Sequence, residues 1–425
     1  MEKYKLYDHQ KKIIQDDKKW FGIFQGTGSG KTNTALHLAK GGTLIICPKQ
    51  QREDRTWQDN AQKFGIDIPL TVVSKEEFRR DYENYRDFST VIIDECHSVL
   101  GVLPETRQRK GIQIPKTSKI FEAVLNYIKK YPPERFYLLS ATPVSKPMNL
   151  WAIAKLFGIN WNFYEFRSKY YFEIKMGQRR IWIPKNDKDI KDKMAEVIKK
   201  LGYTGSLNDF FDVPEQTHQE VFVELTPQQK EAIKQQYQIE ADPMVRRARI
   251  RTIENGILYG KKIEQQGIFD VMTDDTKFFP SKKMDYILER AQEFPKLLIF
   301  ANYTAQIRAI EKFLKKEGYK VSTLTGKTKD RANIIKDADK DDAHILVVQS
   351  SISSGWEFKT CRCIIFASKS WKSVDYHQAL GRTLRSDHLA KNLFIHLIVK
   401  GGPDHDCHKA IMSGANFQER LNLNI

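Results

Sequence analysis

Residues 20–32 read WFGIFQGTGSGKT, and this stretch decides the fold that we expect for the chain. Residues 20–24 form a short apolar run, and residues 31–40 have the apolar spacing of a helix. A glycine-rich turn therefore joins a strand to a helix, which is the first step of an alternating α/β arrangement. Further continuous apolar runs of strand length lie at residues 43–48, 70–74, 91–93 and 136–140, as is typical of a parallel sheet covered on both faces.

The pattern changes between residues 150 and 280, where aromatic and basic residues become more frequent and the spacing is mostly helical, with one strand-like run at residues 219–225. Apolar runs of strand length then return at residues 297–300, 320–324, 345–348, 363–366 and 393–398. The sequence therefore predicts two α/β lobes that flank a mostly helical, basic insert.

Composition limits the classes of function. The chain has 425 residues and a formal charge of +17, which makes a polyanionic partner the expected one. No apolar run approaches the roughly 18–20 residues that cross a bilayer, so no membrane partner is expected. The first residues lack the apolar core of a secretory signal, and the five cysteines are scattered, so we expect a reduced, cytoplasmic protein. The clusters Cys361/Cys363 and His405/Cys407/His408 are both incomplete as zinc sites.

The glycine-rich turn has the chemistry of a phosphate-binding loop. Gly28 and Gly30 let the backbone wrap round phosphate oxygens, and the following helix directs its N–H groups at them. Lys31 would contact the β- and γ-phosphates, and the Thr32 hydroxyl would ligate Mg²⁺. The strict pattern requires glycine where this chain has Gln25, and an ordinary glycine turn is the alternative. The predicted nucleotide-binding residues here are Gly26, Thr27, Gly28, Ser29, Gly30, Lys31 and Thr32.

Asp94 and Glu95 follow the apolar run at residues 91–93, so they would emerge at the carboxyl edge of the sheet, beside the phosphate-binding loop. Asp94 would hold Mg²⁺, usually through water, and Glu95 would polarise the attacking water. The alternative is an acidic pair that caps the next helix.

Gln378, Arg382 and Arg385 recur at helical spacing, which places them on one helix face. Delivered from the second lobe, Arg382 and Arg385 would act as arginine fingers, an effect of ~10³–10⁵ in rate. A solvated basic helix is the alternative reading.

In this order the motifs resemble those of superfamily-two helicases, and more closely the Swi/Snf-like ATP-dependent DNA translocases. Gln10 looks like the glutamine that reads adenine, residues 94–97 (DECH) match motif II, and residues 140–143 (SATP) match motif III. Residues 353–358 resemble motif V and imply nucleotide contacts from Gly355 and Glu357; residues 378–385 match motif VI. Gln25 and Trp356-Glu357 depart from the family pattern. The absence of chromatin-reading modules fits a compact viral, phage or bacterial translocase better than a eukaryotic remodeller.

The resemblance implies two RecA-like lobes, at residues 1–155 and 281–425, with residues 156–280 as the insert. It also implies ATP and Mg²⁺ as cofactors and a DNA strand that crosses both lobes. We call the residues that would contact this strand the track residues. Those carried over from the family are Pro48, Lys49, Ser74, Thr142, Thr325, Gly326 and Ser350; the insert adds Arg179, Arg180, Arg246 and Arg247. For these arginines, an aromatic mini-core with a solvated rim and an interlobe salt-bridge role stay open.

The expected function is an ATP-dependent DNA translocase or helicase without sequence preference. The core motifs do not separate DNA from RNA, so an RNA-dependent ATPase is an alternative. A nucleic-acid clamp or loader switched by ATP is another, although Glu95 and the two arginines argue against it. No nuclease constellation is evident, so cleavage would need a protein partner such as a nuclease; a replication factor is another candidate. The protein would be nucleoid-associated, or in the host cytoplasm if it is viral.

Overall fold

A computed structural model describes residues 5–109, 111–176, 179–185, 187–259, 276–352, 356–383 and 390–420. For Met176, Arg179 and residues 414–420 only the backbone is described. The chain divides into two compact units, which we call unit 1 (residues 1–212 with 416–425) and unit 2 (residues 213–415). No described helix combines the length and the apolar character needed to span a bilayer.

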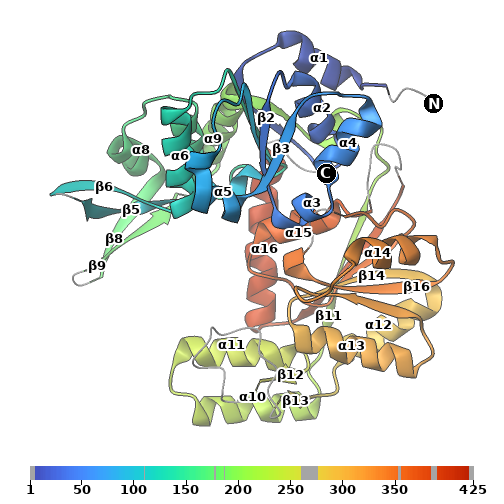
Figure 1. The fold of residues 1–425 in the computed structure, drawn as a ribbon. Coiled ribbons are helices and arrows are strands. Elements are labelled where there is room, and N and C mark those ends of the chain that lie inside the picture. Colours follow the sequence, from blue (N-terminus) through green and yellow to red (C-terminus); the bar gives the residue numbers. More distant parts are fainter. Residues whose placement is uncertain are drawn as a thin grey trace. The chain divides into compact units, whose positions relative to one another are not determined.

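Unit 1 is built on a parallel sheet of six described strands in the order β10-β1-β7-β4-β2-β3 (Figure 1). The strands are β1 (Trp20–Gln25), β2 (Thr43–Cys47), β3 (Leu70–Ser74), β4 (Thr90–Ile93), β7 (Arg135–Leu139) and β10 (Gly202–Gly205). The helices are α1 (Asp8–Asp16), α2 (Lys31–Leu38), α3 (Lys49–Glu53), α4 (Thr56–Phe64), α5 (Lys75–Asp81), α6 (Lys119–Lys130), α7 (Pro147–Leu156), α8 (Phe163–Tyr170) and α9 (Lys188–Leu201). Short 3₁₀ turns lie at Tyr82–Asn84, Cys96–Ser98 and Leu207–Asp209.

Two antiparallel hairpins extend from unit 1 on the same side (Figure 1). One joins β5 (Val102–Arg109) to β6 (Ile112–Thr117), and the other joins β8 (Tyr171–Met176) to β9 (Arg179–Pro184). Neither hairpin is part of the main sheet.

Unit 2 repeats the plan with six described parallel strands in the order β11-β18-β17-β14-β16-β15. These are β11 (Thr217–Val223), β14 (Lys296–Ala301), β15 (Val321–Leu324), β16 (His344–Gln349), β17 (Cys363–Phe366) and β18 (Leu393–Val399). The helices are α10 (Pro227–Ile239), α11 (Pro243–Glu254), α12 (Lys282–Glu293), α13 (Thr304–Lys316), α14 (Arg331–Lys340), α15 (Ser373–Leu380) and α16 (Pro403–Arg420). A 3₁₀ turn (Ser350–Ile352) and a two-stranded pair, β12 (Ile257–Leu258) with β13 (Lys277–Phe278), complete the described elements.

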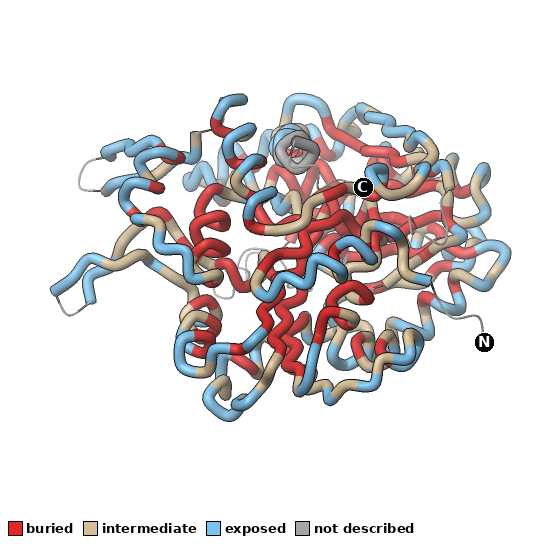
Figure 2. Tube along the Cα trace, turned by 90° about the horizontal axis from the view of Figure 1, so that it is seen from above, coloured by how far each residue is buried: buried red, intermediate tan, exposed pale blue. Residues whose placement is uncertain are grey.

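Each sheet is covered by helices on both faces, as the continuous apolar runs predict. In β2, Leu44 and Ile46 pack into one core with α5, α6 and α7, whereas Ile45 packs into the other with α1, α2 and α4. In Figure 2 the buried segments gather in the interior of the tube and the exposed ones lie at its periphery. The predicted fold class, two parallel-sheet α/β lobes in tandem, is confirmed.

The structure differs from the expected three-part division, because the described part of residues 156–280 is shared between the two units. Strand β10 pairs with β1 in unit 1, and β11 pairs with β18 in unit 2. A side chain at Gly202 would place its Cβ 2.4 Å from the Gly22 carbonyl oxygen, so glycine permits this close pairing. The segment also contains the β8–β9 hairpin, which its mostly helical spacing did not predict.

A buried lysine holds several elements of unit 2 together. The Lys283 Nζ, on α12, donates to Asn255 Oδ1, to the Ala367 carbonyl oxygen and to Asp404 Oδ2, each at 2.8 Å. Burial works to raise the pKa of Asp404, but the charge of Lys283 and its hydrogen bond outweigh it, so that pKa is lowered. The ammonium group thereby links α11, the end of β17 and α16.

We expect Lys283→Met to lower the free energy of unfolding by about 3–5 kcal/mol, because it leaves the buried Asp404 carboxylate without its counter-charge. Urea unfolding measures the loss. The matched control is Lys282→Met, since Lys282 pairs with Asp285 in solvent and such pairs contribute at most about 1 kcal/mol. Equal losses in the two variants would contradict this account.

Candidate active site

The phosphate-binding loop, residues 26–30, lies between the end of β1 and the start of α2. Gly28 and Gly30 both have a φ of 82°, a conformation that glycine adopts without strain. The Gly26 N–H donates to the Gly205 carbonyl oxygen at 2.8 Å, which ties the loop to β10. The Ser29 hydroxyl donates to the Gly26 carbonyl oxygen at 2.8 Å and closes the turn from within.

Lys31 begins α2 and folds its side chain back over this loop. Its Nζ donates to the carbonyl oxygens of Gln25 (2.8 Å) and Gly26 (2.9 Å). The Thr27 hydroxyl oxygen is buried and has no hydrogen-bond partner among the described residues. Thr32 follows in the first turn of the helix. An ammonium group, an unused hydroxyl and a helix N-terminus at one turn fit the phosphates of a nucleotide.

Helix α1 is fastened to the same loop by two side chains. Gln10 Nε2 donates to the Gly30 carbonyl oxygen at 3.0 Å, and Gln10 Oε1 accepts from the Tyr7 N–H at 2.9 Å. His9 Nε2 lies 2.9 Å from the Ser29 carbonyl oxygen, and its ring stacks on Phe210 at 4.0 Å between centroids. The sequence pattern pointed to Gln10 but gave no signal for His9 or Phe210.

Asp94 and Glu95 follow β4 at the carboxyl edge of the sheet, next to the end of β2. Asp94 is buried, and its Oδ1 accepts from the Glu95 N–H at 2.8 Å. Burial, together with the charge of Glu95, raises the pKa of Asp94 to about 6. Glu95 has a left-handed backbone with a φ of 47°, and its side chain makes no capping hydrogen bond to the turn that follows. An oxygen-rich edge of this kind fits a divalent cation.

Ser140 connects Glu95 to the segment that resembles motif III. The Ser140 hydroxyl donates to Glu95 Oε2 at 3.5 Å and accepts from the Thr142 N–H at 3.1 Å. His97 Nδ1 lies 3.1 Å from the same hydroxyl and 3.3 Å from Glu95 Oε2. The contacts of Ser140 with Glu95 and His97 were not predicted, because they join residues more than forty positions apart.

In unit 2, Gln378 lies on α15 and Arg382 just after it, and both are buried. Arg382 donates through Nε to the Gln378 carbonyl oxygen (2.7 Å) and through a terminal nitrogen to the Trp356 carbonyl oxygen (2.5 Å). Glu357 pairs with Lys359 at 3.2 Å. Arg385 and Gly355 lie outside the described residues.

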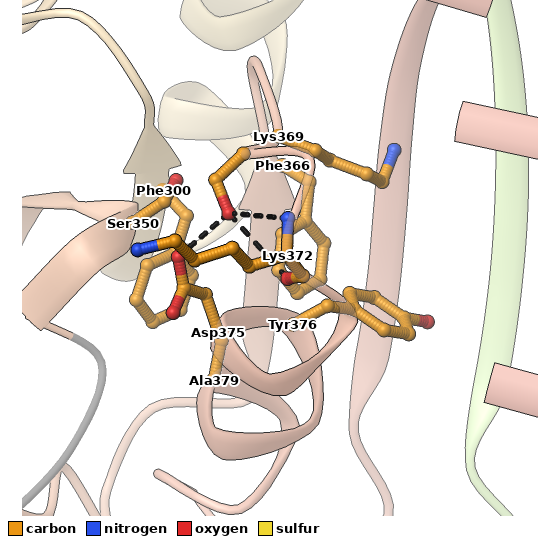
Figure 3. A pocket seen from close by; sticks show the side chains of 9 residues that line it. Phe300, Ser350, Phe366, Lys369, Lys372, Asp375, Tyr376 and Ala379 are labelled. Atoms are coloured by element: carbon orange, nitrogen blue, oxygen red, sulfur yellow. Dashed lines mark hydrogen bonds between the residues drawn. The ribbon is translucent and has the colours of Figure 1, made fainter. Parts of the chain in front are cut away.

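A small pocket opens at the N-terminal end of α15, where β16 and β17 end (Figure 3). The Ser370 hydroxyl donates to Asp375 Oδ2 at 2.6 Å and accepts from the Lys372 N–H at 3.2 Å. Figure 3 shows the side chains of Lys369 and Lys372 pointing in opposite directions, so the two ammonium groups do not converge on one ligand. Ser350, a predicted track residue, lines this pocket.

The other track residues also follow strand ends. In unit 1, Pro48 and Lys49 follow β2, Ser74 ends β3, and Thr142 follows β7, with its buried hydroxyl lacking a partner among the described residues. In unit 2, Thr325 and Gly326 follow β15, and the Gly326 N–H donates to Gln349 Oε1 at 3.1 Å. Within each unit, parallel strands bring these positions to one sheet edge.

The arginines of the expected insert lie in different units. Arg180, on β9, is exposed and pairs with Glu173 at 3.2 Å; for Arg179 only the backbone is described. Arg246 lies over the Tyr237 ring at 5.0 Å, and the neighbouring Arg247 pairs with Asp406.

The chain is similar to known helicases in part of its sequence and in its fold. Residues 281–387 match the family described as the helicase conserved C-terminal domain. The helicase domain of Hef from Pyrococcus furiosus has 14% identity and a TM-score of 0.52, over 95% of this chain and 98% of that one. The SWI2/SNF2 ATPase core of Sulfolobus solfataricus, solved in complex with dsDNA, has 17% identity and a TM-score of 0.41, over 98% of this chain and 93% of that one. A search of curated proteins found no match.

Residues 281–387 therefore form a helicase C-terminal domain, and the whole chain has the tandem RecA-like fold of helicases. The resemblance to superfamily-two helicases that the motifs carry is confirmed. The chain thus contains a helicase C-terminal domain and shares the fold of a helicase domain over its length.

We expect Asp94→Asn to stabilise the protein at pH 8, measured by urea unfolding without divalent cations. An acid whose pKa is raised from 3.8 to about 6 destabilises the fold only when it is ionised, so the cost is absent below about pH 4 and complete above pH 6. The gain should be about 1–3 kcal/mol at pH 8 and absent at pH 4. Asp67→Asn, at an exposed position, is the control. A gain that is independent of pH would show that charge is not its cause.

Proposed function

We propose that this protein is an ATP-dependent DNA translocase or helicase, which hydrolyses ATP to move along or unwind DNA without sequence preference. The observation that carries the proposal is the placement of the phosphate-binding loop with Lys31, and of Asp94 with Glu95, at the ends of β1 and β4 in one parallel sheet. The carboxyl edge of such a sheet is where nucleotides bind.

The loop residues bind and orient the triphosphate. The N–H groups of Thr27, Gly28 and Gly30 and those at the start of α2 would face its oxygens. Lys31 Nζ would exchange its two carbonyl partners for the β- and γ-phosphates. Thr32 and Asp94 would hold Mg²⁺, which neutralises charge on the phosphates when bound. Asp94 must be ionised for this role, and its raised pKa places that ionisation near pH 6.

Glu95 is the residue that orients the attacking water. Its carboxylate lies at the edge of the same site, and Ser140 and His97 fix its position. From unit 2, Arg382 and Arg385 would supply positive charge to the transferring phosphate. The buried contacts of Arg382 with Gln378 and Trp356 support a fixed orientation for its guanidinium group.

The formal charge of +17 and the track residues support DNA as the polymer. Ser74, Thr142, Thr325 and Ser350 carry hydroxyl groups at strand ends, and such groups contact phosphates without reading sequence. Binding of this kind weakens steeply as salt increases.

The first test is steady-state ATP hydrolysis with no nucleic acid, with single-stranded DNA, with duplex DNA and with RNA. We expect DNA to stimulate hydrolysis and Lys31→Ala to lower the stimulated rate at least about 100-fold, because it removes charge that stabilises the transition state. Lys40→Ala, at an exposed residue two positions beyond the end of α2, should leave the rate unchanged. Stimulation by RNA alone would replace the DNA proposal with an RNA-dependent ATPase, and a single turnover without continued hydrolysis would indicate a clamp or loader.

Ser140→Ala tests whether the contacts of Ser140 support ATP hydrolysis without contributing to nucleotide binding. We expect it to lower the DNA-stimulated rate about 10–100-fold, because it removes a hydrogen bond to the charged Glu95 and an acceptor for the Thr142 N–H, whereas KM for ATP should hardly change. Ser145→Ala, whose hydroxyl bonds only to Asn149 in the described structure, is the control. A rise in KM with an unchanged maximal rate would contradict this role for Ser140.

A further inference from the structure

Two neighbouring side chains of α1 hold two neighbouring carbonyl groups of the phosphate-binding loop. His9 Nε2 lies 2.9 Å from the Ser29 carbonyl oxygen, and Gln10 Nε2 donates to that of Gly30 at 3.0 Å. A Cβ at residue 30 would collide with the Gln10 amide group, so α1 approaches the loop this closely because Gly30 has no side chain. The two contacts therefore belong to a closely packed junction between α1 and the loop.

The hydrogen bond of His9 has a defined direction. A carbonyl oxygen can only accept, so Nε2 carries the hydrogen and donates it to Ser29. Burial lowers the pKa of His9, which favours the neutral ring at pH 7. A neutral imidazole with its hydrogen on Nε2 has none on Nδ1. The contact thus depends on Nε2 alone.

Phe210 fixes the plane of the His9 ring. The two rings stack with their centroids 4.0 Å apart and an angle of 16° between their planes. A Cβ at residue 205 would collide with the Phe210 ring, so this ring also packs directly against Gly205, whose carbonyl oxygen accepts the Gly26 N–H. One aromatic side chain therefore supports two of the hydrogen bonds that hold the loop.

The peptide unit between Ser29 and Gly30 carries the effect of His9 to the other side of the loop. This peptide is trans and planar, and the C=O and N–H of such a unit point in opposite directions. A hydrogen bond that holds the Ser29 carbonyl group toward α1 therefore turns the Gly30 N–H away from α1. The left-handed backbone of Gly30, with a φ of 82°, favours a concavity of N–H groups that binds anions.

We propose that His9 is a positioning residue for the phosphates of the nucleotide: through the Ser29 carbonyl group it fixes the direction of the Gly30 N–H. This inference rests on the proposed function and assigns a role in its nucleotide site to a residue outside the loop. The role concerns the phosphates and is independent of the base, unlike the contact with adenine that the family resemblance implies for Gln10. Phe210 contributes indirectly, because it holds the His9 ring.

The experiment measures, without DNA, the binding of ADP and of tripolyphosphate, both with Mg²⁺. Tripolyphosphate can occupy a phosphate site but has no base. We expect His9→Phe, which keeps a ring against Phe210 but has no donor, to weaken both ligands by the same factor of about tenfold. His9→Gln should restore most of the affinity and His9→Asn should not, because only the longer amide side chain extends as far from the backbone as Nε2.

His37→Phe is the matched control. His37 Nδ1 also lies 2.9 Å from a backbone carbonyl oxygen, that of Asn33, and its ring packs against an aromatic side chain, Phe64. Because Asn33 lies within α2 and not in the loop, this variant should bind both ligands as the wild-type protein does.

Hydrolysis kinetics give a second readout, which a general loss of stability would not reproduce. The Gly30 N–H would contact the phosphates equally before and during the reaction. We therefore expect His9→Phe to raise KM for ATP about tenfold and to leave the maximal DNA-stimulated rate nearly unchanged. This is the opposite of the result expected for Ser140→Ala.

Four results would overturn the proposal: wild-type affinity of His9→Phe for both ligands, weaker binding of ADP but not of tripolyphosphate, equal affinities of His9→Gln and His9→Asn, or an equal loss in His37→Phe. The second result would assign His9 to the base or the ribose. The third would show that the hydrogen bond is not the cause.

The binding experiment tests His9 separately from the proposed function. If the variants behave as expected but DNA fails to stimulate ATP hydrolysis, the proposed function fails and the role of His9 stands. If DNA stimulates hydrolysis and His9→Phe binds both ligands normally, the role of His9 fails and the proposed function stands. A wild-type protein that binds neither ADP nor tripolyphosphate would overturn both.

Discussion

A loop that presents N–H groups to phosphate oxygens keeps few of them for its own hydrogen bonds, so residues 26–30 must be held in place largely from outside. Three neighbours do this in unit 1. Strand β10 accepts the Gly26 N–H through the Gly205 carbonyl oxygen, Gln10 donates to the Gly30 carbonyl oxygen, and His9 lies against that of Ser29. The positive φ angles of Gly28 and Gly30 give the turn its shape, and the surrounding α1 and β10 keep it. The candidate site depends on this support, because α2 and the Lys31 side chain start from the same turn.

The parallel sheets were predictable because their central strands are continuous apolar runs, which only burial on both faces explains. The edge strands β10 and β11 are not continuous apolar runs: β10 was not predicted, and β11 was predicted only as a strand-like run at residues 219–225 within the insert. Residues 202–205 (GYTG) pair with β1 through a glycine contact at Gly22, and residues 217–223 (THQEVFV) begin with four polar residues and are apolar only at their end. Both edge strands come from the segment that was expected to be a separate insert. Composition marked that segment as different, but pairing partners more than 170 residues away along the chain determine where each part belongs.

The candidate site was predictable to the extent that parallel strands send their carboxyl ends to one edge, which is why Asp94 and Lys31 could be placed in the same sheet. The side-chain contacts that position Glu95 within the site were not predictable. The Ser140 hydroxyl contacts Glu95 and His97 because β7 and β4 are neighbours, and no spacing in the sequence carries that information.

The excess of positive charge was an equally coarse indicator of nucleic-acid binding. Arg135, Arg251 and Arg382 are buried and bonded within their own units, so part of the basic excess supports the fold, and exposed residues such as Lys175 carry the case for nucleic acid.

The same site explains why nucleotide and cation should matter for the fold of unit 1 as well as for chemistry. An ionised Asp94 is buried beside a second carboxylate, and Glu95 takes a left-handed backbone that non-glycine residues adopt at a cost of about 1–3 kcal/mol. Lys31 offsets part of the repulsion at Asp94 but is itself bonded to loop carbonyls. A divalent cation would supply the positive charge that the two carboxylates lack, and the phosphates bound with it would attract the Lys31 ammonium group away from the loop carbonyl oxygens. Ionisation of Asp94, which the proposed chemistry requires, therefore costs stability in unit 1, and binding of the nucleotide and cation would offset that cost.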